Sequence, residues 1–90
     1  MLALENFKKF RDTKLAKILH NDAVLNGKKK KTDKLPQGHF VLKNETCEAL
    51  VKGNPYLDKN DLLKVKGIGK ENFKLFGDAI YDYFTRSSNF

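Results

Sequence analysis

The N-terminal part of the chain has a helical pattern of apolar and polar positions. Charged residues separate apolar residues that recur at spacings of three and four, which places the apolar side chains on one face of an α-helix. These apolar residues are Leu4, Phe7, Phe10, Leu15, Ile18 and Leu19. No glycine or proline interrupts the stretch, so we predict an amphipathic helix over Leu4–Leu19.

The pattern breaks between His20 and Gly38. A glycine, a run of lysines and the sequence Leu35-Pro36-Gln37-Gly38 are typical of a loop. Like charges in a block repel one another and stay solvated. We therefore predict a mobile basic loop over about residues 21–39, in which Ala23–Leu25 form a short apolar anchor.

The apolar run Phe40–Leu42 is too short to find a sheet partner elsewhere in the chain. It predicts either a strand or an extended lead-in to a helix. Asn44 is the expected N-cap of that helix, because its side chain can accept from a free backbone N–H. Glu45 and Glu48 lie in the first turns, where a negative charge interacts favourably with the helix dipole. Gly53-Asn54-Pro55 is expected to end this helix.

Two further helices are predicted in the last third of the chain. Asp58 and Asp61 form an acidic version of the capping box before a short apolar segment, and Gly67–Gly69 then forces a tight turn. The last helix has apolar residues at spacings of three and four, with Gly77 as a point where it bends or divides. Those residues are Phe73, Phe76, Ile80, Tyr83 and Phe84. The expected fold is all-α, a bundle of four to five short helices with core residues over about 4–84.

Composition agrees with one folded domain covering residues 1–90. The chain is 40% hydrophobic, which is too apolar for a disordered chain. It contains no run of about twenty apolar residues, and Met1–Glu5 turns polar at once, so we expect neither a membrane span nor a secretory signal. Cys47 is the only cysteine, which excludes a disulfide framework and fits a cytoplasmic location.

The net charge of +7 points to an anionic partner, most often nucleic acid. Six lysines and one aspartate lie between Gly27 and Lys43, which accounts for +5 of that charge. Mobile lysines at positions 28, 29, 30, 31 and 34 can neutralise phosphates through counterion release. The alternative is a solvated loop with no specific partner.

Gly67-Ile68-Gly69 is the second candidate. Glycines allow unusual backbone angles and close approach, and the N–H groups that begin the next helix can hold a phosphate. Flanking positive charge comes from Lys64, Lys66 and Lys70. The alternative is a turn that only packs two helices together, with Ile68 in the core.

Aromatic side chains are the third candidate, because bases stack on them. The spacing assigns Phe7, Phe10, Phe73, Phe76 and Phe84 to the core. His39, Phe40 and Tyr56 remain as candidates for base contact, and Tyr81 and Tyr83 offer further surfaces. No pair of acids is spaced for acid–base or metal chemistry, so we predict no catalytic residue, no metal site and no cofactor. The lysine run could attract a membrane surface by charge, but no strongly apolar face lies beside it to insert into the bilayer, so we do not expect membrane binding.

Two stretches together carry a family resemblance. The first is Phe40–Leu50 followed by Asn54-Pro55, and the second is Asp61–Gly69 followed by the aromatic residues of the last helix. With Phe10-Arg11 as a third point, their order resembles the HRDC domain, the helicase-and-RNase-D C-terminal module, over about residues 4–84. The chain differs in its long basic insertion and in having Cys47 where the family prefers leucine. Phe10 stands where many members have tryptophan.

The resemblance implies a five-helix auxiliary domain of a DNA helicase, or less often of a ribonuclease D. Some members bind single-stranded DNA weakly, and others contact protein instead. We therefore expect a monomer that binds single-stranded or partly duplex DNA, with RNA also open, and that lies beside the parent helicase domains. The alternative is a docking or regulatory domain without DNA binding. The nucleic-acid-binding candidates are Lys28, Lys29, Lys30, Lys31, Lys34, Lys43, Lys64, Lys66, Gly67, Gly69 and Lys70.

Overall fold

The first third of the chain is one long helical rod. In the computed structural model, which describes residues 2–87, α1 (Leu2–Phe10) continues through a π-helical segment, η1 (Arg11–Leu15), into α2 (Ala16–Leu25). The predicted helix is therefore confirmed, but it extends six residues beyond Leu19. Ala23–Leu25, expected as an anchor in the loop, are its last residues. The loop proper is shorter than predicted and spans residues 26–37.

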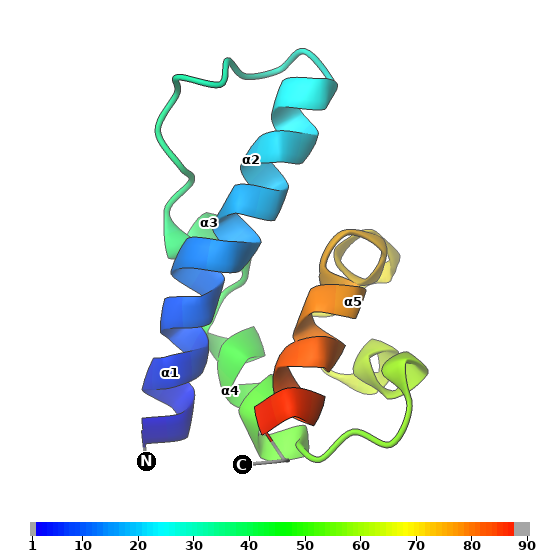
Figure 1. The fold of residues 1–90 in the computed structure, drawn as a ribbon. Coiled ribbons are helices and arrows are strands. Elements are labelled where there is room, and N and C mark those ends of the chain that lie inside the picture. Colours follow the sequence, from blue (N-terminus) through cyan, green and yellow to red (C-terminus); the bar gives the residue numbers. More distant parts are fainter. Residues whose placement is uncertain (1, 88–90) are drawn as a thin grey trace.

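The next two helices are short and lie against this rod. Helix α3 (Gly38–Val41) contacts η1 and α2, and α4 (Asn44–Gly53) contacts α1. Neither the strand nor the extended lead-in predicted for Phe40–Leu42 is observed. Val41 and Leu42 are both buried, and a single helical turn is sufficient to point them into the core. Figure 1 shows the loop leaving the free end of α2 and running back beside the rod to α3.

The start of α4 differs from the prediction by one residue. Lys43 is the N-cap and makes no side-chain capping bond, while Asn44 is the first helical residue. The Asn44 side-chain oxygen instead accepts from Arg11 Nη1 at 2.8 Å. The predicted end of the helix at Gly53-Asn54-Pro55 is confirmed.

The last third begins with a 3-10 segment, η2 (Lys59–Lys64). The predicted capping box is confirmed, since Asp58 accepts from the Asn60 N–H and Asp61 accepts from the Asp58 N–H. Helix α5 (Lys70–Ser87) then runs through Gly77 without dividing. Among residues 2–87 there is no strand, so the fold is all-α, a bundle of five α-helices with the basic loop inserted after the first rod.

Aromatic rings join the two ends of the chain in the core. The Phe7 ring stacks on Phe84 with centroids 5.2 Å apart, and Tyr83 packs against Phe10 at 4.5 Å. Burial confirms the core assignment of Phe7, Phe76 and Phe84, while Phe10 and Phe73 pack partly buried against the same cluster. Within the described residues, no helix is long and apolar enough to cross a membrane.

Candidate nucleic-acid interface

Helix α3 presents two aromatic side chains to solvent. Phe40 is 70% exposed, and its ring centroid lies 4.2 Å from that of His39. Val41 and Leu42 are buried on the opposite side of the same turn, and so they hold the aromatic pair outward. A base could therefore stack on Phe40 without any rearrangement of the core.

Arg11 fixes where this turn lies. Its guanidinium is almost fully buried, and its Nη1 donates to the Leu42 carbonyl at 3.1 Å and to the Asn44 side chain at 2.8 Å. Gly38 lies directly against Arg11 and Asp12. A Cβ on Gly38 would overlap the Asp12 carboxylate and the Arg11 guanidinium. The resemblance named Arg11, but nothing in the sequence indicated that it positions Phe40.

The turn before α5 packs against α4. Gly67 has a φ of +96°, and a Cβ on it would overlap Thr46 Oγ1. Ile68 is 5% exposed, and the Asn72 side chain donates to the Gly67 carbonyl at 3.1 Å. The packing role predicted for the turn is thus confirmed: Ile68 enters the core and the glycine allows the close approach.

A groove of about 310 Å³ joins these two features. Its eight lining residues come from α3, the link between α3 and α4, the first turn of α4, the turn at Gly67 and the first turn of α5. They are His39, Phe40, Val41, Leu42, Lys43, Thr46, Gly67 and Asn72. The groove therefore brings together four of the predicted site residues: His39, Phe40, Lys43 and Gly67. Thr46 was missed because it contacts Gly67 from 21 residues away in the sequence. Asn72 was missed because its hydrogen bond back to Gly67 has no sequence signal that we used.

The remaining candidates lie elsewhere. Lys28–Lys31 are exposed in the loop, which Figure 1 shows at the free end of α2, away from α4. Lys64 and Lys66 line a different groove, beside Pro55 and Tyr56. The Lys64 ammonium also lies 3.6 Å from the Asp61 carboxylate, which offsets part of its charge. The structure thus divides the positive charge among separate places.

Tyr56 is not available for base stacking, and that prediction is wrong. Its side chain is only 8% exposed, and its hydroxyl donates to the Leu50 carbonyl at 2.6 Å. Burial raises the pKa of Tyr56 to about 12. The position of Tyr56 after Pro55 in a loop did not indicate that the chain folds back onto the end of α4, where the Tyr56 side chain is buried.

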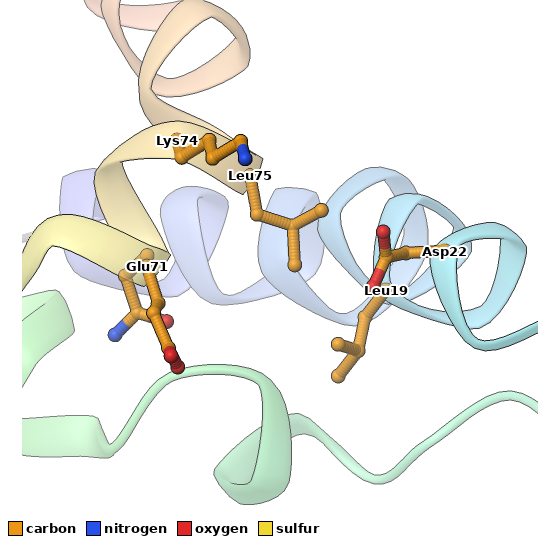
Figure 2. A pocket seen from close by; sticks show the side chains of 6 residues that line it. Leu19, Asp22, Glu71, Lys74 and Leu75 are labelled. Carbon is orange, nitrogen blue, oxygen red and sulfur yellow. The ribbon is translucent and has the colours of Figure 1, made fainter. Parts of the chain in front are cut away.

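The start of α5 is a weaker anion site than the glycines indicated. Glu71 lies in the first turn of the helix, where its carboxylate already interacts with the positive end of the dipole. Glu71 also lines a groove of about 550 Å³ between α2 and α5, with Asp22 on the other side. Figure 2 shows these two side chains on either side of Leu19 and Leu75. Two carboxylates disfavour a phosphate backbone there.

Cys47 is buried in the core, with its sulfur 3.6 Å from Arg11 Nη1. Burial raises the pKa of the Cys47 thiol, although the Arg11 guanidinium acts in the opposite direction. Among residues 2–87, no three His, Cys, Asp or Glu side chains are grouped so that they could hold a metal ion.

The chain is thus a small all-α bundle with one groove in which the exposed aromatic pair His39 and Phe40 lies beside Lys43. Comparison with family models, with curated proteins and with solved structures found no match.

Proposed function

We propose that the chain is an auxiliary nucleic-acid-binding domain of a DNA helicase, which holds single-stranded or partly single-stranded DNA in the groove between α3 and the Gly67 turn. The observation that supports this proposal is the groove itself. An exposed phenylalanine, a lysine and a glycine turn come from three elements and line one surface. The resemblance to the HRDC domain points to the same function.

Each part of the groove has a role in the proposal. A base stacks on Phe40, which is worth about 1–3 kcal/mol, and His39 widens the aromatic surface. Lys43 is exposed beside it and neutralises a phosphate, while Gly67, held close to Thr46 by packing, forms the opposite wall of the groove. The loop lysines act at longer range by attracting the strand, because charge attraction needs no fixed geometry.

Sequence preference should be slight, because phosphate contacts carry no sequence information and stacking on an aromatic ring accepts every base. The isolated domain should bind weakly, with a Kd on the order of the 10⁻⁴–10⁻⁶ M of non-specific binding. For about three to four phosphates neutralised, an increase from 50 to 200 mM salt weakens binding to single strands by roughly 20- to 50-fold.

The test is fluorescence anisotropy of a labelled single-stranded oligonucleotide. Phe40→Ala should weaken binding at least fivefold, and Lys43→Ala should weaken it and lower the salt slope by about 0.7. Leu57→Ala is the matched control for Phe40, because Leu57 is 89% exposed and lies outside the groove. Lys17→Ala on α2 is the control for Lys43.

Equal binding by Phe40→Ala and Leu57→Ala would remove the groove from the proposal. Absence of binding by the unaltered protein at 50 mM salt would favour the alternative, a domain that docks on protein. The exposed Leu57 and Leu63 on the segment around η2 favour that alternative, since neither lies among the loop lysines.

A further inference from the structure

The basic loop closes over a small pocket on α2. The pocket has a volume of about 110 Å³, and six residues line it: Leu19, His20, Ala23, Lys29, Lys34 and Pro36. A cavity of about 150 Å³ with apolar walls is enough for benzene. A pocket of about 110 Å³ is smaller than that cavity and has room for one leucine-sized side chain.

Hydrogen bonds hold the walls of this pocket in place. The Lys28 N–H donates to the Ala23 carbonyl at 2.8 Å, which ties the start of the loop to the end of α2. His20 is buried beneath the loop, with its Nε2 3.4 Å from the Lys31 carbonyl oxygen. A pocket that is already formed costs its occupant less ordering entropy than one that must be assembled.

Positive charge surrounds the opening. Five lysines lie between positions 28 and 34, and Asp33 is the one acid among them. The Asp33 carboxylate accepts from the Lys30 N–H at 2.9 Å and so faces the loop backbone. Lysine stems lie along apolar surface while their ammonium groups stay in water. An occupant of the pocket thus has apolar contacts inside and cations at the mouth.

Nucleic acid does not fit this combination. A base would turn its polar edge against the apolar side chains of Leu19, Ala23 and Pro36, and a phosphate would lose hydration there. An acidic peptide has both required parts, since its carboxylates meet the lysines and one aliphatic side chain enters the pocket. We infer that the pocket beneath the basic loop is a docking site for an acidic peptide segment of a partner protein, anchored by one leucine-sized side chain.

This site shares no lining residue with the groove proposed to bind DNA, so it goes beyond that function. The test uses the whole chain and two fluorescein-labelled hexapeptides of aspartate and glutamate, one with a central leucine and one with a central glycine. Anisotropy at 50 mM salt should show about tenfold tighter binding of the leucine peptide, because its side chain is buried.

Ala23→Met fills the pocket and leaves the charge unchanged. It should reduce the leucine preference from about tenfold to less than twofold, while the glycine peptide binds as before. Asn21→Met is the matched control, since Asn21 is exposed on the same helix and should keep the full preference. Circular dichroism establishes that both variants are folded.

A second variant covers the case in which Ala23→Met does not fold. Leu19→Ala enlarges the pocket and should shift the preference toward a peptide with central phenylalanine. Equal binding of the leucine and glycine peptides to the unaltered protein would overturn the inference. So would an unchanged leucine preference in folded Ala23→Met, or an unchanged preference in Leu19→Ala.

Two further measurements distinguish a peptide occupant from DNA and from a second copy of the chain. Loss of oligonucleotide binding in Phe40→Ala with unchanged peptide binding would separate the groove from the pocket, although the loop lysines attract both ligands. Sedimentation velocity tests for a second copy of the chain as occupant. A concentration-dependent dimer that Ala23→Met abolishes would assign the pocket to self-association and overturn the peptide inference.

Discussion

Arg11 Nη1 donates a 2.8 Å hydrogen bond to the side-chain oxygen of Asn44, 33 residues further along the chain. The bond ties the rod formed by α1, η1 and α2 to the first turn of α4. The same nitrogen also donates to the buried Leu42 carbonyl at 3.1 Å. Arg11 thus holds α3, and with it Phe40, in place.

Arg11→Leu should destabilise the domain by about 2–3 kcal/mol, because it leaves the Leu42 carbonyl buried without this donor. Urea denaturation measures the change, which corresponds to a fall in Tm of roughly 10–20 °C for a domain of this size. Arg86→Leu is the control, since Arg86 is exposed and its Nε lies 2.9 Å from the Asp82 carboxylate on the same helix. Its effect should stay below about 0.5 kcal/mol.

Gly67→Ala should cost more than about 1 kcal/mol, because residue 67 has a φ of +96° and its Cβ would overlap Thr46 Oγ1. Gly69→Ala is the matched control, because a Cβ there has no atom within 4 Å and φ is not positive. Thermal unfolding of both variants checks the difference. Equal losses of stability would show that the close approach to Thr46 has no energetic consequence.

Tyr56 should make the domain sensitive to alkali. Its pKa is raised from the usual value near 10 to about 12 by burial, so the unfolded chain releases this proton first as pH rises. Neutral Tyr56 therefore contributes about 2–3 kcal/mol to the free energy of unfolding. This contribution is complete below about pH 10 and is lost progressively as the pH rises to about 12.

Tyr56→Phe isolates the contribution of this one hydroxyl to the pH dependence of stability. At pH 7 the variant should be about 1 kcal/mol less stable, since the hydrogen bond to Leu50 is lost. Between pH 9 and 11 its stability in urea should fall less steeply than that of the unaltered protein. If the stability of the variant and that of the unaltered protein fell in parallel with pH, Tyr56 would not be the source of the alkali sensitivity.

The four lysines at positions 28–31 should contribute to nucleic-acid affinity only through charge. Changing all four to alanine should weaken oligonucleotide binding at 50 mM salt and make the salt dependence shallower, because fewer counterions are released. At 200 mM salt the two proteins should differ much less. A variant that binds equally at 50 mM salt would leave Lys43 in the groove as the main source of attraction.

The helices were largely predictable, because the signals that define them are local. Apolar residues at spacings of three and four define the rod and α5, and the pair Asp58 and Asp61 marks the start of η2 within four residues of sequence. The extension of α2 to Leu25 was missed, because residues 20–25 lack a clear apolar stripe. Asn44 was misread as a cap, because its side chain bonds to a distant arginine.

What the sequence by itself determined is therefore the class of the fold, the basic charge of the loop and the need for glycine in the turn at Gly67. Each follows from spacing, charge or backbone freedom within a few residues. Tertiary structure alone decided that Tyr56 is buried, that Phe40 and Gly67 line one groove and that the loop covers a pocket on α2. These depend on contacts between residues far apart in sequence, which no local pattern encodes.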